Sequence, residues 1–270
     1  MFRQIQALFR YRLLIWDLAI KDIKIKYRNP ILGSLWSIFI PLTMVFIFKF
    51  IFSDIMKAKI EDYPFFIYLM TAVFPWTYFA TSVSASLESI VSNRELIKKT
   101  FFPRQIIPVS VVLANLINFL PSLIVILLCL VFFRIQFTFF LFLVPVILLL
   151  QTLLTIGCAL IVSSLQVVLR DVKYIVELTL MVLLYLSPGF YSLTLIANVS
   201  QRLLKIYVYN PFVGLFVLYR IAFLKGYAKT LPPGMDIPDL ITWTVVVCFA
   251  IFFIGFWVFK RYEGRFSDLI

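Results

Sequence analysis

Histidine is absent from this chain, and cysteine and glycine are scarce. Without histidine, neither a Ser-His-Asp nor a Cys-His catalytic arrangement can form. The three cysteines, Cys129, Cys158 and Cys248, all lie within apolar runs and predict neither a disulfide framework nor a zinc site. Eight glycines are too few for a phosphate cradle, and none is followed by Lys-Ser or Lys-Thr as in a P-loop. We therefore expect no catalytic residue, no metal site and no cofactor bound by this chain itself.

Acidic residues are also rare inside the long apolar runs. Glu177 is the one acid well within such a run, close to its start, where a helix N-terminus stabilises a carboxylate. The sequence therefore lacks the series of intramembrane acids typical of proton- or sodium-coupled transporters. It also lacks the clustered acids of glycosyltransferases and metal hydrolases. If the protein moves a substrate against a gradient, another chain has to supply the energy.

Apolar side chains are what the sequence has in abundance. The 270 residues are 63% hydrophobic, against about 45–50% in a soluble domain, and the mean hydropathy is +1.02. About 20 apolar residues cross a bilayer as a helix, and a helix satisfies its own backbone hydrogen bonds there. We therefore predict an all-α integral membrane protein with a six-span domain over residues 31–260. The expected spans are 31–52, 65–87, 106–133, 137–164, 174–191 and 240–259.

Positive charge is distributed unevenly between the two ends of these spans. Lys and Arg number 25 against 13 Asp and Glu, and this net charge of +12 favours an anionic membrane surface or an acidic partner over nucleic acid. Six spans place both termini on one side, which then carries 16 cations against 8 on the other. The positive-inside rule makes that side the cytoplasm, with a short tail at 261–270. Residues 1–30 alternate charged and apolar side chains, so we expect no cleaved signal peptide.

Residues 1–30 predict an amphipathic helix lying in the plane of the membrane surface. Its polar stripe is Arg3, Arg10, Asp17, Lys21, Lys24 and Arg28, and its apolar side is Ile5, Phe9, Trp16, Ile20, Ile23 and Tyr27. The Asn29-Pro30 pair then ends the helix and turns the chain into the first span. On periodicity alone, a topology anchor without further function explains this helix equally well.

The stretch SNRELIKKTFFPRQ, Ser92 to Gln105, is basic and helix-favouring, and lies between the second and third spans. Glu95 and Lys99 are spaced for a favourable i,i+4 pair. Ile90, Ile97 and Phe101 share one helical face, so residues 88–103 predict a stiff amphipathic helix. The alternative is a basic loop that only fixes the topology.

The outer segment 192–224 carries a break in an otherwise apolar run. Lys205 and Arg220 flank the Asn210-Pro211 pair, which interrupts any helix through Leu203 to Leu224. Non-helical backbone at membrane depth is tolerated where protein or a water-filled cavity surrounds it. We expect a pair of re-entrant helices here. The alternative is a seventh span, which would place the basic tail outside.

Aromatic residues repeat along two spans. Trp36, Phe39, Phe46 and Phe50 share one face of the first span, and Tyr174, Met181 and Tyr185 share one face of the fifth. Such faces can stack on the C–H faces of successive sugars, which would suit a polymer conduit. For any single ring, contact with lipid or with the membrane interface is the simpler explanation.

Four stretches of the chain have to be considered together. They are KDIKIKYRNPILGSLWSIFIP (21–41), FPWTYFATSVSASLESIVSNRELIKKTFFPRQIIP (74–108), LRDVKYI (169–175) and YNPFVGLFVLYRIAF (209–223). In this order they resemble the permease subunits of bacterial ABC exporters for O-antigen, capsule and teichoic acid polymers. The resemblance runs from about residue 10 to the tail. No single motif is specific, but four in register are.

The resemblance implies a homodimer in the bacterial inner membrane with both termini cytoplasmic. It also implies two copies of a cytoplasmic ATPase that binds ATP and Mg, membrane lipids, and a lipid-linked polysaccharide as substrate. It implies a coupling helix at 88–103 and an outer gate at 192–224. The corresponding residues are Arg94, Glu95, Lys98, Lys99 and Arg104 for ATPase coupling; Lys21, Asp22, Lys24, Tyr27 and Arg28 in the interface helix; Arg170 and Asp171 in a cytoplasmic loop; Trp36, Phe39, Phe46, Phe50, Tyr174, Met181 and Tyr185 as channel-lining candidates; and Tyr209, Asn210, Pro211, Gly214 and Arg220 at the outer gate.

Other functions stay open from the sequence. Within the family, the alternative to an O-antigen exporter is a capsule or teichoic acid exporter, and a drug or antibiotic exporter is the nearest competitor. Outside it, the chain could be a lipid-linked-sugar scramblase that needs no ATPase, or a structural assembly factor of the cell envelope.

Overall fold

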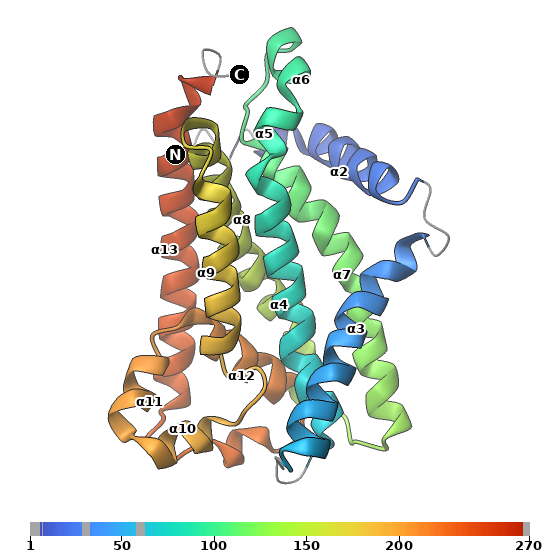
Figure 1. Cartoon of the computed structure of the whole chain (residues 1–270), viewed down its shortest axis with the longest axis vertical. Helices are drawn as coiled ribbons and strands as arrows, with labels where there is room; N and C mark the ends of the chain where they lie inside the picture. The colour runs from blue at the N-terminus through green and yellow to red at the C-terminus, as the bar shows by residue number, and fades with distance from the viewer. Residues whose placement is uncertain (1–5, 7, 29–32, 58–62, 267–270) are drawn as a thin grey trace.

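A computed structural model describes residues 6, 8–28, 33–57 and 63–266, and every regular element within them is a helix. Arg3, Ile5, the Asn29-Pro30 turn and the expected start of the first span at residue 31 lie outside this part of the chain. The all-α prediction is therefore confirmed for the described residues (Figure 1).

Five segments of the described chain are long and apolar enough to cross a membrane. They are α3 (Trp36–Phe48) continued by the π-helix η2 (Lys49–Ile55), α4 (Phe65–Leu87), α7 (Ile106–Phe132), the 3-10 turn η3 (Phe139–Leu143) continued by α8 (Val144–Val168), and α13 (Ile237–Glu263). The wider turns of η2 bring Lys49 within 2.9 Å of Asp54, so the charge inside the first span is paired.

The fifth predicted span is shorter than expected. Helix α9 (Val172–Leu186) has 15 residues and is about 22 Å long, against about 30 Å for the hydrocarbon core of a bilayer. After Leu186 the chain is not helical, and residues 187–190 are buried by the rest of the protein. The predicted span 174–191 is thus a helix completed by a buried non-helical segment, which protein contacts make tolerable at membrane depth.

The long helices run between two ends of the bundle, and the shorter helices lie at these ends, here named the α6 end and the α10 end (Figure 1). At the α6 end lie α2 (Arg12–Lys26), α5 (Ser89–Ser92), α6 (Arg94–Lys99) and the C-terminus of α13. At the α10 end lie α10 (Leu193–Val199), α11 (Gln201–Tyr207), α12 (Pro211–Phe223) and η4 (Tyr227–Thr230). Helices α11 and α12 meet at 89° and both lie at the α10 end, a bend that fits either a broken span or a re-entrant pair, so the re-entrant arrangement stays a prediction.

Helix α4 is the centre of the bundle. It packs against α3, α7, α8, α9 and α12, and most of its side chains are buried. Helix α13 runs along α8, and two glycines allow their backbones to touch. A Cβ on Gly255 would overlap the backbone of Gly157, and a Cβ on Gly157 would overlap the carbonyl of Ile251. Small residues at such a crossing are typical of helix packing in membranes, because they let the backbones approach closely and van der Waals packing helps to drive helix association there.

Candidate functional site

The segment expected to form one coupling helix over 88–103 is in fact two short helices, α5 and α6. Asn93 separates them, and its side-chain Nδ2 donates to the carbonyl of Ser89 at 2.9 Å. This local bond competes with the helical pattern, as asparagine side chains commonly do. Lys21 of α2 also donates to Asn93 Oδ1 at 3.2 Å, so the break is tied to the neighbouring helix.

Four of the five predicted coupling residues, Arg94, Glu95, Lys98 and Lys99, are exposed on α6. Lys99 and Glu95 form the expected i,i+4 ion pair at 3.1 Å, and both side chains are mostly in solvent. The expected apolar face is only partly present. Ile90 and Ile97 are buried, whereas Phe101 follows the end of α6 and is fully exposed, because the chain turns extended at Thr100.

Arg104 lies apart from these exposed charges. Its Nη1 donates to the backbone carbonyl of Glu263 at 2.8 Å, and its backbone N–H donates to Glu263 Oε1 at 3.3 Å. A cation at the C-terminus of a helix is favourable because it meets the unpaired carbonyls there. Arg104 thus joins the segment between α6 and α7 to the end of α13.

Helix α2 packs on the bundle with a face that the sequence pattern did not single out. Ile15, Leu18 and Ala19 are buried, and Ile15 and Leu18 pack with Ile106 and Val109 of α7. On the predicted apolar side, Phe9 and Trp16 are exposed. Ile20, Ile23 and Tyr27 on the same side are partly buried, and the placement of this side in the membrane interface stays a prediction. Apolar side chains occur on more than one side of α2, so periodicity alone could not select the side that meets α7.

The polar residues of α2 fall into two groups. Asp17, Lys21, Lys24 and Arg28 line one shallow hollow on the exposed side. Asp22 and Lys26 lie toward α4, α5 and α7. Partial burial raises the pKa of Asp22, with some compensation from Lys21, and lowers the pKa of Lys26. Tyr27 is half-buried at the end of the helix.

A second link at the α6 end joins α4 to α9. Arg170 and Asp171 are exposed in the turn between α8 and α9, and the Arg170 carbonyl accepts from Gln166 Nε2 at 3.1 Å. Two residues further on, Lys173 forms an ion pair at 2.9 Å with Glu88 at the end of α4. This ion pair connects the start of α9 to the junction between α4 and α5.

All seven channel-lining candidates are exposed on the surface of the single chain. They are Trp36, Phe39 and Phe46 on α3, Phe50 on η2, and Tyr174, Met181 and Tyr185 on α9. Helix α4 contacts both α3 and α9 and lies between them (Figure 1). The aromatic faces thus point away from the core of this chain, one on each side of α4.

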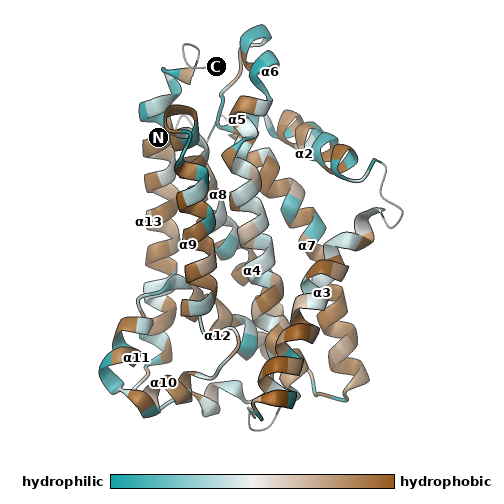
Figure 2. Ribbon diagram, viewed as in Figure 1, coloured by the Kyte–Doolittle hydropathy of each residue, from teal (hydrophilic) through white to brown (hydrophobic). Residues whose placement is uncertain are grey.

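A hydroxyl-bearing face of α4 lies between these two helices, and sequence reasoning missed it. Thr77, Thr81 and Ser84 follow at spacings of four and three, so they share one side of the helix, and Thr81 and Ser84 are exposed. Figure 2 shows the half of α4 nearer the α6 end as paler than the brown helices α3, α9 and α13. The hydroxyls of Thr77 and Thr81 each donate to a backbone carbonyl one turn earlier in α4; Thr81 donates to the Thr77 carbonyl at 2.7 Å. The lone pairs of both hydroxyl oxygens stay available to accept hydrogen bonds. The signal was present in the hydroxyl-rich run TSVSASLES.

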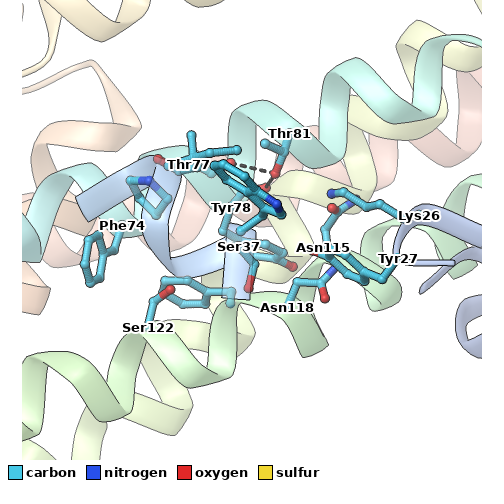
Figure 3. A pocket seen from close by; sticks show the side chains of 14 residues that line it. Lys26, Tyr27, Ser37, Phe74, Thr77, Tyr78, Thr81, Asn115, Asn118 and Ser122 are labelled. Atoms are coloured by element: carbon cyan, nitrogen blue, oxygen red, sulfur yellow. Dashed lines mark hydrogen bonds between the residues drawn. The ribbon is translucent and has the colours of Figure 1, made fainter. Parts of the chain in front are cut away.

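A cavity of about 100 Å³ opens beside this face, between α2, α3, α4 and α7 (Figure 3). Lys26, Asn115 and Asn118 line it and also line a second cavity of about 250 Å³ that reaches Asn93. Asn115 Nδ2 donates to the Val111 carbonyl at 3.0 Å. The two cavities give the polar groups of α7 room for water within a predominantly apolar layer.

At the α10 end, Asn210 and Pro211 build the bend between α11 and α12. Asn210 Oδ1 caps α12 by accepting from the Phe212 N–H at 3.0 Å, and Asn210 Nδ2 donates to Ser187 Oγ at 3.1 Å. Pro211 stands in the first turn, where its missing N–H costs nothing. Gly214 lies directly against α13, because a Cβ there would overlap the hydroxyl of Thr244.

Arg220, one of the predicted outer-gate residues, lies inside the protein. It is fully buried, with Cζ 3.6 Å from the centroid of the Tyr68 ring, and Nη2 donates to the Gly189 carbonyl at 3.1 Å. Its Nε and Nη1 have no hydrogen-bond partner among the described residues. The bond to Gly189 satisfies a backbone group in the non-helical segment after α9, so Arg220 holds that segment between α12 and α4.

Known proteins align with this chain over most of its length. Residues 14–224 match the family described as ABC-2 type transporter. A Klebsiella pneumoniae protein named "O-antigen export system permease protein RfbA" is 31% identical over 251 residues, which cover 93% of this chain and 92% of that protein. A Myxococcus xanthus protein of the same name is 32% identical over 250 residues, which cover 93% and 94%. The resemblance carried by the four sequence stretches is confirmed, and the chain belongs to the ABC-2 type transporter family.

Proposed function

We propose that this chain is the permease subunit of an ATP-driven exporter that moves a lipid-linked polysaccharide of the O-antigen type across the bacterial inner membrane. The observation that carries the proposal is the hydroxyl face of α4 with an exposed aromatic helix on each side, in a chain similar over 93% of its length to permeases named for O-antigen export. Side-chain hydroxyls can exchange hydrogen bonds with sugar hydroxyls, and aromatic rings can pack on the C–H faces of sugars.

A second copy of the chain covers α3 and α9 in this proposal. Helix α9 has one buried residue, Val172, and its exposed residues other than Glu177 and Thr179 are apolar or aromatic. A helix that exposes mainly apolar side chains belongs in lipid or in an interface. Two copies facing one another through α3 and α9 would enclose the hydroxyl face of α4 and form a conduit between the halves.

The α6 end is the cytoplasmic side in this proposal, and each copy meets one ATPase subunit through α6. The cations Arg94, Lys98 and Lys99 and the exposed Phe101 offer a charged rim with one aromatic anchor. Motion at α6 reaches α13 through Arg104 and Glu263. ATP binding by the partner shifts the permease only as far as its contacts differ between the two permease states.

Charge reversal of Lys98 and Lys99 to glutamate tests this docking. The variant should insert normally but lose both export and stimulation of the ATPase, because the cationic rim is inverted. Lys229→Glu, an exposed lysine at the α10 end, is the matched control and should keep both. Surface polysaccharide and ATPase turnover of the purified complex are the measurements, and normal export with full stimulation in the double variant would refute the docking role.

Deletion of the chain tests the transport role itself. Surface polysaccharide should disappear while lipid-linked glycan accumulates on the cytoplasmic side. Export that persists with a catalytically dead ATPase would instead favour a scramblase.

A further inference from the structure

A groove of about 450 Å³ lies at the α10 end, between the end of α11 and the first turns of α13. Its lining includes Lys205 and Tyr209 from the α11 side, and Asp236, Asp239, Thr242 and Trp243 from α13. The groove is at the far end of the molecule from the cationic α6, and it does not include the aromatic faces of α3 and α9.

The start of α13 supplies three of the groove's principal groups. Asp239 and Trp243 are four residues apart and share one side of α13, and Asp236 directly precedes the helix and also lines the groove. Trp243 Nε1 donates to the Tyr209 carbonyl at 3.1 Å, and the two rings meet edge to face with centroids 5.1 Å apart. Tyr209 is therefore held in position by α13, although it is 62% exposed.

The carboxylates beside these rings are available to a ligand. Asp236 and Asp239 are exposed, and within the described chain neither side chain is hydrogen-bonded or ion-paired. A fixed aromatic ring next to free carboxylates suits a sugar, whose C–H face packs on the ring while its hydroxyls donate to the acids. Because the groove has two acids and one lysine, an anionic lipid headgroup would be repelled. Lipid acyl chains are disfavoured too, because charged side chains are costly next to hydrocarbon.

We propose that this groove is a binding subsite for neutral sugar units of the exported polysaccharide, used as the chain emerges on the outer side. Tyr209 supplies the stacking surface, Trp243 positions Tyr209, and Asp236 and Asp239 accept hydrogen bonds from sugar hydroxyls. The inference rests on the proposed function for the nature of the polymer, but the subsite is distinct from the conduit between α3 and α9.

Binding of glycan to the full-length protein in lipid nanodiscs tests the subsite. The probe is the host's own surface polysaccharide, freed from its lipid by mild acid, and its dissociation constant is measured by calorimetry. Tyr209→Leu and Trp243→Leu should each weaken binding about tenfold, the loss expected when one aromatic contact is removed. Asp239→Asn should weaken it about threefold, because the amide keeps one acceptor.

Trp257→Leu is the matched control. Trp257 is also exposed on α13 but lies at its other end, beneath Arg261, so this variant should bind as the unmodified chain does. Thermal unfolding checks that each variant is folded. Tyr209→Leu and Asp239→Asn remove no side-chain hydrogen bond among the described residues, so they stay informative if Trp243→Leu unfolds.

Absence of glycan binding by the unmodified chain would overturn the inference, and so would equal binding by Tyr209→Leu or equal weakening by Trp257→Leu. Those results would leave the transport proposal standing if deletion of the chain still abolishes surface polysaccharide. Export that survives the deletion would refute the transport proposal instead.

Discussion

Helices α3 and α4 are neighbours, yet α4 is mostly buried in the protein and α3 is mostly exposed. In the most apolar stretch of each, 78% of the α4 residues are buried inside the protein, against 11% for the segment Trp36–Ile55 that begins with α3. The exposed segment is nevertheless the more apolar, with a mean hydropathy of 2.0 against 1.3. Hydropathy does not report burial here, because lipid chains and the protein interior favour the same side chains.

Polar content is what separates the two helices. Thr71, Ser82 and Ser86 of α4 are buried and bond to carbonyls of their own helix, whereas Thr81 and Ser84 are exposed between α3 and α9. Polar groups within a membrane need protein or water as partners. In α4 the hydroxyl groups are buried in the protein or lie between α3 and α9, whereas α3 and α9 expose mainly apolar side chains, apart from Thr43, Glu177 and Thr179.

The contrast between the buried α4 and the exposed helices beside it is tested most directly by truncating one buried and one exposed side chain. Phe74→Ala in α4 removes a fully buried ring and should lower the free energy of unfolding by roughly 3 kcal/mol. Met181→Ala, on the exposed side of α9, should leave the unfolding of the solubilised monomer nearly unchanged. Thermal melting in detergent is the measurement, and equal losses would show that α9 is part of the core.

The α8–α13 crossing should respond next most strongly. Gly255→Ala pushes a Cβ into the Gly157 backbone and should cost about 1–3 kcal/mol of stability, the usual cost of overpacking. Gly264→Ala is the control at the end of α13, because a Cβ there meets no atom of the described chain within 4 Å. A stable Gly255→Ala variant would mean that the two helices separate easily.

Arg220 provides the link between buried α4 and the α10 end. Arg220→Lys keeps the charge but loses the planar contact with Tyr68 and the bond to Gly189, and should cost about 2 kcal/mol. Arg202→Lys, at an exposed position of α11, should cost nothing. Unfolding measurements on both variants decide the point, and equal stability would remove Arg220 as the residue that holds the segment after α9.

The smallest effect on stability, and a clear one on function, is expected at the hydroxyl face of α4. Thr81→Val with Ser84→Ala removes two exposed hydroxyls without disturbing buried groups, so unfolding should change by less than about 0.5 kcal/mol. Export of polysaccharide should slow several-fold if this face contacts the sugar chain. Unchanged export would place the conduit elsewhere.

Run lengths and the scarcity of charge, by themselves, determined that this is an α-helical membrane protein, because backbone hydrogen bonds in lipid have to be satisfied within each segment. The Glu95–Lys99 pair and the bend at Asn210-Pro211 were equally readable, since both depend on residues close in sequence. Four short stretches of sequence were also enough to identify the family.

Only the tertiary structure decided what depends on residues far apart in the chain. Arg220 is buried because Tyr68 and Gly189, distant in sequence, surround it. The packing face of α2 is set by Ile106 and Val109 of α7. Periodicity places a side chain on one side of its own helix, but which neighbour that side meets is decided by the packing of the whole bundle.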